Sequence, residues 1–353
     1  MKAIRAGAVQ AAPVFMNLEA SIDKAAMLIE EAVKGGAELV AFPETWLPGF
    51  PWFIYLGTPA EALAFFPRYH DNSMPVDSPQ MRRLQAIVKR AGVTVVMGFS
   101  ERDVGSRYMA QAIIDPNGDL LLTRRKLKPT HIERTVFGEG DGSDLVVVDA
   151  PFGRLGALNC WEHVQPLMKM AMYAQHEEVH VASWPSLSIY RDIAYALGPE
   201  VNNAASMIYA VEGGCFVLAP CAVISQEMFD MLCDTPQKAH LLNPRTNGPG
   251  GGFTVIYGPD GRALCEPLAE HQEGILYADL DPTLIILSKA TADPVGHYAR
   301  GDAVRLIINR SKRRVVTEIN QTSNIDLAPP GIRSLDEQVI GMPGSTLETG
   351  TRQ

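Results

Sequence analysis

Residues 153–167 read GRLGALNCWEHVQPL, in which an alternating apolar run ends on Cys160 and is followed by tryptophan, glutamate and histidine. Over residues 164–175, approximately, the apolar side chains then recur at the spacing of a helix. A strand that stops at a reactive atom and turns sharply into a helix presents that atom above a sheet. A buried, inert cysteine is the more common fate of a single thiol, but such a residue usually has apolar neighbours. The polar neighbours of Cys160 favour a nucleophile.

The predicted turn also has a consequence for the thiol. Backbone N–H groups at the start of a helix lower the pKa of a nearby thiol and can bind an anion that develops during a reaction. We therefore expect the pKa of Cys160 to be lowered. The remaining cysteines are expected to fill space in the core, and they are Cys215, Cys221, Cys233 and Cys265.

Strand-like and helix-like segments alternate on both sides of this stretch. The expected strands lie at residues 3–10, 37–42, 93–99, 153–160, 179–184 and 214–220. The expected helices lie at 18–34, about 78–91, about 164–175 and about 196–211. This alternation is typical of an α/β fold.

Two further segments have the pattern of a hairpin. Residues 108–125 and 251–268 each place an Asn-Gly or Asp-Gly turn between β-prone runs. Strands joined by a hairpin run antiparallel, so the sheets are expected to be mixed. The same pattern occurs in both halves of the chain, and no linker divides them. We therefore expect two sheets of like construction that pack together, with helices outside.

Composition and charge exclude several classes of protein. The chain has 353 residues, of which 46% are hydrophobic, as expected for a packed globular core. Its formal net charge of -9 argues against a nucleic-acid partner, since such proteins neutralise phosphates with clustered Lys and Arg. No run approaches the ~20 apolar residues that span a bilayer, so no membrane partner is expected. Five cysteines without a paired spacing suit a reducing compartment, which predicts a cytoplasmic protein.

Three charged residues stand where strands are predicted to end or shortly after. Glu44 follows the run ELVAF and a proline, at the strand end where open α/β sheets keep their chemistry. Lys126 ends the run LLLTRRK, and Glu133 follows within a segment that also holds His131 and Arg134. Taken singly, each of these residues is more simply explained as a solvated charge.

Taken together, these segments resemble the nitrilase branch of the carbon–nitrogen hydrolase superfamily, and most of all the bacterial arylacetonitrilases and aromatic nitrilases. The motifs that carry the resemblance are FPETWLPGFP (42–51), RRKLKPTHIERTVFGEG (124–140) and LNCWEHVQPL (158–167). Further segments agree in the same order, namely 175–186, 201–217 and 293–300, so the resemblance covers roughly residues 3–300.

The resemblance implies a role for each candidate residue. It makes Cys160 the nucleophile, Glu44 the general base, Lys126 the stabiliser of developing charge and Glu133 a second glutamate that orients water. The implied fold is a four-layer α-β-β-α sandwich with two mixed sheets, which pairs into an eight-layer dimer and builds larger homo-oligomers, often spirals. We expect the carbon–nitrogen hydrolase domain to occupy residues 1–305, followed by a C-terminal extension (306–353) that is partly extended or disordered.

The implied reaction converts an organic nitrile to a carboxylic acid and ammonia through a covalent thioimidate and a thioester on Cys160. It needs no metal and no organic cofactor. The expected substrates are aromatic nitriles or arylacetonitriles, and the expected substrate-binding residues are Trp161, Phe50, Trp184 and His131. The aromatic members of this set are equally well explained as ordinary core residues.

Three alternatives stay open at this stage. Amidases and cyanide-hydrating enzymes of the same superfamily share the glutamate, lysine and cysteine, so these residues do not choose the substrate. The motif His176-Glu177-Glu178-Val179-His180 would bind zinc as a metalloprotease does if it lay on a helix, but its surroundings predict a strand. A binding protein that has lost catalysis would normally lack one of the polar residues, and here all are present.

Overall fold

The structure is a computed structural model that describes residues 1–313 and 316. Met1–Arg310 form one compact unit. Most of the predicted extension, 306–353, lies outside the described residues, so its extended or disordered state stays a prediction. Among the helices of the described residues, none combines the length and the apolar character that a bilayer crossing requires.

The strands of the described chain form two mixed sheets. The first has the order β11 (Gly274–Leu280), β1 (Ile4–Gln10), β2 (Leu39–Ala41), β3 (Thr94–Asp103), β4 (Ser106–Ile114) and β5 (Leu120–Arg125). The second has the order β10 (Val255–Tyr257), β9 (Phe216–Ala219), β8 (Val179–Ser183), β7 (Gly153–Asn159) and β6 (Val148–Ala150). In each sheet three neighbouring strands run parallel, β1-β2-β3 and β7-β8-β9, and the outer strands pair antiparallel. The prediction of two sheets of like construction is confirmed.

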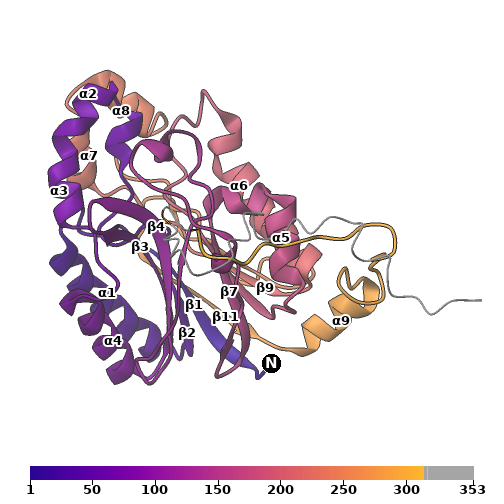
Figure 1. The fold of residues 1–353 in the computed structure, drawn as a ribbon. Coiled ribbons are helices and arrows are strands. Elements are labelled where there is room, and N and C mark those ends of the chain that lie inside the picture. The colour runs from indigo at the N-terminus through magenta and orange to yellow at the C-terminus, as the bar shows by residue number, and fades with distance from the viewer. Residues whose placement is uncertain (314–315, 317–353) are drawn as a thin grey trace, which may run out of the picture. The chain divides into compact units, whose positions relative to one another are not determined.

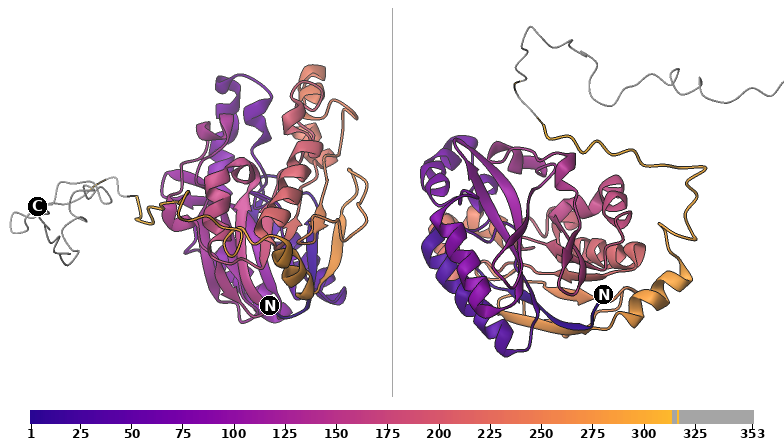
Figure 2. Two further views of the ribbon diagram at one scale, coloured as in Figure 1. Left: turned by 90° about the vertical axis from the view of Figure 1, so that its right-hand side faces the viewer. Right: turned by 60° about the horizontal axis from the view of Figure 1, so that its bottom comes forward.

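Helices cover the outer face of each sheet, which gives four layers in the order α-β-β-α (Figures 1 and 2). The first sheet is covered by α1 (Leu18–Lys34) and α4 (Pro79–Ala91), and the second by α5 (Pro166–Tyr173) and α6 (Pro199–Gly213). α1 begins where the Asn17 side chain accepts from the N–H of Ala20, and its apolar residues recur on the side that contacts the sheet. Alternate residues of both sheets fill the space between them. The predicted fold class is therefore confirmed.

Short helices that the sequence patterns did not predict gather at one end of the sandwich. They are α2 (Pro59–Ala62), α3 (Phe66–Asp71), α7 (Gln226–Leu232) and α8 (Pro236–Leu242), which lie together at the upper left of Figure 1. With the 3-10 helix η1 (Trp52–Tyr55) they enclose an aromatic core of their own. Each has eight residues or fewer, too few for a helical period to stand out in the sequence.

Two predicted elements differ from the structure. The hairpin expected at 251–268 is reduced, because its first arm forms only β10 and its second arm pairs through a single bridge between Tyr257 and Ala263. The helix expected at about 164–175 begins at Pro166, since residues before it form a tighter 3-10 turn. The remaining helices are α9 (Thr283–Thr291), η2 (Leu63–Phe65), η3 (His131–Thr135), η4 (Gly142–Asp144) and η6 (Tyr195–Leu197).

Candidate active site

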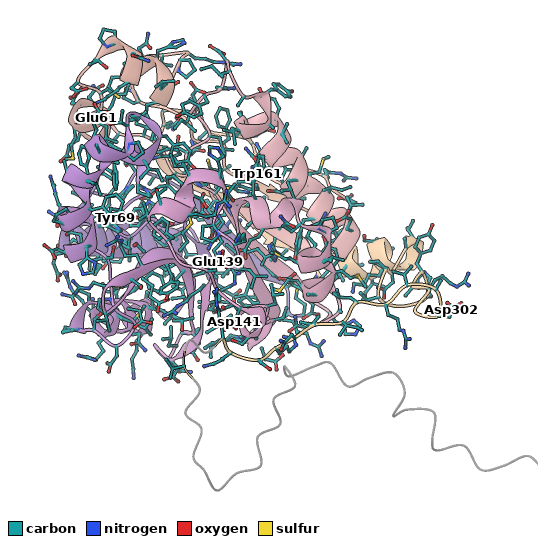
Figure 3. The ribbon with its side chains drawn as sticks, turned by 45° about the horizontal axis from the view of Figure 1, so that its top comes forward. Glu61, Tyr69, Glu139, Asp141, Trp161 and Asp302 are labelled. Atoms are coloured by element: carbon teal, nitrogen blue, oxygen red, sulfur yellow. The ribbon has the colours of Figure 1, made fainter. Side chains whose placement is uncertain are left out.

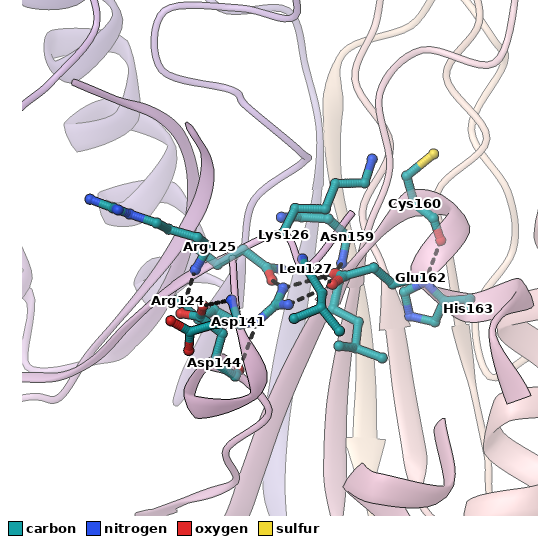
Figure 4. Close-up of polar contacts among 12 residues, drawn as sticks. Arg124, Arg125, Lys126, Leu127, Asp141, Asp144, Asn159, Cys160, Glu162 and His163 are labelled. Carbon is teal, nitrogen blue, oxygen red and sulfur yellow. Dashed lines mark hydrogen bonds and ion pairs between the residues drawn. The ribbon is translucent and has the colours of Figure 1, made fainter. Parts of the chain in front are cut away.

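The strand before the cysteine ends in a sharp turn, as predicted. β7 ends at Asn159, and Cys160–Val164 form the 3-10 helix η5. Cys160 has a φ of +46°, in the left-handed region that residues other than glycine rarely adopt. Its carbonyl oxygen accepts a hydrogen bond from Nδ1 of His163 at 2.6 Å (Figure 4). Cys160 is 8% exposed and borders a cavity.

The structure brings the four predicted catalytic residues together. Nζ of Lys126 donates to Oε1 of Glu44 at 2.9 Å and to Oε2 of Glu133 at 2.8 Å. One carboxylate oxygen of each glutamate and Sγ of Cys160 all lie within 4.8 Å of one another. The side chains of Lys126 and Cys160 point to the same side in Figure 4. Residues far apart in the sequence therefore meet around one point in space.

Backbone hydrogen bonds of the sheets and turns fix each charged side chain. The N–H of Glu44, which follows β2, donates to the carbonyl of Trp184 at the end of β8. Lys126 directly follows β5, and its N–H donates to the carbonyl of Met109 on β4. Glu133 lies in η3, where its Oε2 also accepts from the N–H of Thr130 at 2.5 Å. The site thus lies where both sheets end.

Burial controls the proton affinities of the site. Burial raises the pKa of Glu44 to about 8, although the ammonium of Lys126 acts in the opposite direction. Burial alone would lower the pKa of Lys126, but the carboxylates of Glu133 and Glu44 outweigh it and raise that pKa well above its usual value. Lys126 therefore stays an ammonium ion.

The expectation of a lowered thiol pKa is wrong. Burial, together with the carboxylate of Glu44, raises the pKa of Cys160 well above its usual value, and the opposing effects of Lys126 and of the Trp161 N–H are smaller. The sequence showed the turn but not that its thiol would be closed off from water. Cys160 therefore keeps its proton at rest. Oε2 of Glu44 is buried and has no hydrogen-bond partner among the described residues.

A cavity of about 40 Å³ lies above the thiol. Phe50 and Trp161 line it, in agreement with their predicted place at the site. The indole N–H of Trp161, which is labelled in Figure 3, donates to Asn202 of α6 at 3.0 Å. The lining also includes residues to which the sequence analysis gave no role, among them Tyr55, Leu187, Ile189 and Leu197.

The structure does not bring the other two predicted substrate-binding residues to this cavity. Trp184 is wholly buried behind the site, where its indole N–H donates to Ser206 at 2.9 Å. His131 is exposed and lines a neighbouring cavity of about 230 Å³. Both cavities share Thr130 and Trp161 in their linings. Sequence position alone could not separate a wall of the cavity from the core behind it.

Tyr55 is the most informative residue that the sequence reasoning missed. Burial raises the pKa of its phenol, and so do the neighbouring Glu133 and Cys160, which places Tyr55 beside the reacting groups as a neutral hydroxyl. It lies in η1, one of the short helices that no periodic pattern predicted. The only available signal was its place shortly after the FPETWLPGFP motif.

The residues of the site suit proton transfer better than metal binding. Among the described residues, Glu44, Glu133 and Cys160 place their ligand atoms closely enough to hold a metal ion. The ammonium of Lys126 already lies between the two carboxylates, so a cation there would face a like charge. The HEEVH segment is also no zinc site, because β8 begins at Val179 and places His180 in the core while His176 is exposed.

The fold thus brings a thiol, an ammonium and two carboxylates to one buried point that borders a cavity. Residues 5–290 match the family model described as carbon-nitrogen hydrolase. The chain therefore belongs to the carbon–nitrogen hydrolase family.

Curated relatives carry the comparison further. A nitrilase of Pseudomonas syringae pv. syringae is 51% identical, over 93% of this chain and 98% of the relative. An aliphatic nitrilase of Rhodococcus rhodochrous is 49% identical, over 90% of this chain and 84% of the relative. An arylacetone-specific nitrilase of Alcaligenes faecalis is 45% identical, over 93% and 91%. The crystal structure of a carbon-nitrogen hydrolase from Helicobacter pylori G27 shares the fold, with a TM-score of 0.65, 18% identity, and coverage of 85% of this chain and 96% of that chain.

Proposed function

We propose that this protein is a nitrilase, which hydrolyses organic nitriles to carboxylic acids and ammonia with Cys160 as its nucleophile. The observation that carries the proposal is the buried cluster in which Lys126 bridges Glu44 and Glu133 beside the thiol. The nitrilases to which the chain is about half identical support nitriles as the substrate class.

The first half of the reaction forms a thioimidate. Glu44 takes the proton of Cys160 as the sulfur attacks the nitrile carbon, which breaks one π bond of the nitrile and forms the carbon–sulfur bond. The nitrile nitrogen receives that proton from Glu44, with the ammonium of Lys126 beside it. The pKa of about 8 suits Glu44 to both accepting and returning a proton near neutral pH.

The second half releases ammonia and then the acid. Water adds to the thioimidate, and Lys126 with the N–H of Trp161 stabilises the charge of the tetrahedral intermediate. Glu44 takes the hydroxyl proton of this intermediate and passes it to the nitrogen, the carbon–nitrogen bond breaks, ammonia leaves, and a thioester remains. A second water, activated by Glu44 and oriented by Glu133, breaks the thioester to the carboxylic acid and the free thiol. If sulfur leaves before nitrogen, an amide forms as a minor product.

For the substrate side chain we propose an aromatic or arylacetic group. Support comes from the aromatic residues around the cavity, which are Phe50, Trp52, Tyr55 and Trp161. The volume of about 40 Å³ suffices for the nitrile group but not for an aromatic ring. A ring would therefore extend towards the adjoining cavity that Trp161 and His131 line. The substrate-binding roles of Phe50, Trp161, Trp184 and His131 all stay proposals, and Trp184 would act only through the groups in front of it.

Assembly and location are proposals as well. We infer a homodimer that builds larger homo-oligomers, supported by apolar side chains that α6 and the η5–α5 segment expose to solvent: Val164, Leu167, Met207, Ile208 and Val211. Exposed apolar clusters of this kind mark protein interfaces. A cytoplasmic location is supported by the five free cysteines.

The decisive experiment is a panel of nitriles and matching amides assayed for ammonia release, with the ratio of acid to amide recorded. A nitrilase releases ammonia from nitriles, whereas an amidase of the same superfamily would release it from the amides alone, and a cyanide-hydrating enzyme would act only on cyanide. Cys160→Ala is expected to stay folded and to lose essentially all turnover. Nitrile hydrolysis retained by that variant would contradict the assignment of the nucleophile.

A further inference from the structure

A continuous chain of buried polar groups runs from the nucleophile to α6. The carbonyl oxygen of Cys160 accepts from Nδ1 of His163 at 2.6 Å, Nε2 of His163 lies 2.9 Å from Nε2 of His180, and Nδ1 of His180 lies 2.6 Å from Oε1 of Glu177. Oε2 of Glu177 accepts from the hydroxyl of Tyr209 at 2.7 Å. All four side chains are at most 1% exposed. Glu177 and His180 come from the HEEVH segment, to which the proposed mechanism gives no role.

The three contacts between the Cys160 carbonyl and Glu177 determine how many protons this series of hydrogen bonds holds. Each hydrogen bond requires one proton between its two heavy atoms, so the three contacts require three protons. A carbonyl oxygen brings none, and the two neutral imidazoles bring one each. An ionised Glu177 beside two neutral histidines would therefore leave one contact between two lone pairs. The missing proton must rest on Glu177 or make one imidazole cationic.

We propose that Glu177 is a neutral carboxylic acid in the active enzyme, and that the proton it donates to His180 sets both histidines so that His163 holds the carbonyl of Cys160. In this arrangement His180 accepts at Nδ1 and donates from Nε2, and His163 accepts at Nε2 and donates from Nδ1. Glu177 is thus a positioning residue for the nucleophile. The inference deepens the proposed nitrile hydrolysis and rests on it only where turnover is measured.

The electrostatic surroundings place the proton on Glu177. Burial raises the pKa of Glu177 to about 8, against the hydrogen bond from Tyr209. Burial lowers the pKa of His180 well below its usual value, and the nearby Arg124 adds to this while Glu162 opposes it. Burial and the neighbouring His180 likewise lower the pKa of His163 well below its usual value. A cationic imidazole is therefore disfavoured at both positions.

The other titratable groups that face Glu177 do not supply a compensating charge. Burial raises the pKa of Tyr173 on α5 and of Cys215 before β9, so both are neutral. Tyr209 on α6 is neutral for the same reason. Charged groups lie one contact further out, where Glu212 accepts from Tyr173 and pairs with Lys169, and Lys289 faces Cys215.

The strands and helices around the carboxyl are shaped to hold it. Gly156 of β7 pairs in register with His180, and a Cβ at position 156 would lie 1.8 Å from Oε1 of Glu177. On the other side, the ring of Tyr209 stacks on the imidazole of His180 with centroids 3.9 Å apart. Glu177 therefore has little room for another rotamer that would break its contact with His180.

Loss of the third proton would change the hydrogen bond to the carbonyl of Cys160. If the histidines turned their protons towards an ionised Glu177, Nδ1 of His163 would present a lone pair to the carbonyl of Cys160. That carbonyl belongs to a residue with a φ of +46°, a conformation that its surroundings must maintain. The position of Sγ would then be less well defined, which slows attack more than it weakens substrate binding.

The test compares two substitutions at one position. In Glu177→Gln, the amide supplies an N–H to His180 and an oxygen to Tyr209, so every hydrogen bond is kept without a titrating group. We expect E177Q to keep kcat for a nitrile within about twofold. Glu177→Leu removes the donor, and we expect kcat to fall about ten- to hundredfold with little change in KM. Glu178→Gln, the next carboxylate of the same segment, which pairs with the amino group of Met1, is the matched control and should keep the wild-type rate.

Spectra test the proton without turnover, including the case in which E177L does not fold. The infrared carbonyl stretch of a protonated carboxyl should appear at neutral pH in the wild type and in E178Q, and the wild-type minus E177Q difference should contain it. Nitrogen NMR should show His163 protonated at Nδ1. A difference spectrum without the band, or a folded E177Q that loses as much kcat as E177L, overturns the proposal. If the wild type hydrolyses no nitrile, the proposed function fails, while the spectra still decide the proton.

Discussion

Arg124 and Glu162 form a buried, bidentate ion pair with nitrogen–oxygen distances of 2.9 and 2.7 Å (Figure 4). The same carboxylate accepts the N–H of Asn159 at 2.8 Å and the N–H of Leu127 at 2.8 Å. Glu162 therefore ties the residue before the nucleophile to the residue after Lys126. The spacing between thiol and ammonium is set by a group that touches neither.

Glu162→Gln is expected to lower both stability and activity. It leaves Arg124 as a buried charge without a counter-ion, and breaking a buried pair in this way costs about 3–5 kcal/mol of unfolding free energy. Urea unfolding followed by fluorescence measures the loss, and kcat on a nitrile should fall in the same variant. The control is Glu38→Gln, which breaks a solvent-exposed pair with Lys2 and should change little. Equal unfolding curves for E162Q and the wild type would show that the pair does not hold the site.

The pH dependence of catalysis should follow Glu44. Its pKa is raised by burial to about 8, and only the carboxylate form can take the thiol proton. The pKa of Cys160 lies higher, so the thiol does not ionise by itself in this range. We therefore expect kcat/KM to rise with pH up to about 8 in the wild type and in E177Q, and to level off above that pH in E177Q, where residue 177 cannot lose a proton. Initial rates on an uncharged nitrile in overlapping buffers measure this, and a profile that is already flat at mildly acidic pH would contradict it.

The ammonium of Lys126 should be indispensable. In Lys126→Met the carboxylates of Glu44 and Glu133 lose the charge between them, so their mutual repulsion raises the pKa of Glu44 further and the charge of the intermediate is no longer stabilised. Loss of one such stabilising group costs about 10²- to 10³-fold in kcat. The matched control is Lys128→Met, which removes a half-exposed ammonium that pairs with Glu139. Similar rates for the two variants would remove Lys126 from the mechanism.

Stability should depend on pH through Glu177. Its pKa is near 4.5 in an unfolded chain and is raised by burial to about 8 in the folded protein. Between these values the folded state binds more protons than the unfolded state, so the stability that Glu177 contributes is present below about pH 4.5 and is lost as pH rises to about 8. E177Q does not titrate. Its melting temperature should exceed that of the wild type by a margin that grows over this range, as scanning calorimetry would show, whereas a constant margin would contradict the raised pKa.

The sequence carried most of the fold because the long elements are periodic. The helix at 18–34 and the hairpin at 108–125 each repeat an apolar pattern long enough to be recognised, and both occur as predicted. The helices between residues 52 and 71 and between 226 and 242 are too short for such a pattern, and tertiary contacts around an aromatic core maintain them. Those unpredicted helices include the segment that carries Tyr55.

The candidate site was predictable as a set of residues but not as an environment. Glu44, Lys126, Glu133 and Cys160 were found through motifs, and the structure brings them within contact. The direction of the thiol pKa was not predictable, because it depends on how completely other segments bury the turn and on the carboxylate of Glu44 that they bring beside it. Trp184 shows the same limit, since a tryptophan beside a motif can stand either in the cavity wall or one layer behind it.

The cavity wall and the layer behind it should respond differently to substitution. Leu197, in η6, lines the cavity and is half-buried, so Leu197→Ala enlarges the space at modest cost in stability. One methylene more or less in an apolar pocket changes the discrimination between two substrates by about 10- to 200-fold. We therefore expect kcat/KM for an arylacetonitrile to rise at least about tenfold relative to kcat/KM for a small aliphatic nitrile. Trp184→Phe instead removes the hydrogen bond to Ser206 from the core. It should lower the melting temperature and leave the ratio between the two nitriles unchanged. A ratio that shifts in W184F and not in L197A would place the substrate side chain behind the cavity that borders Cys160.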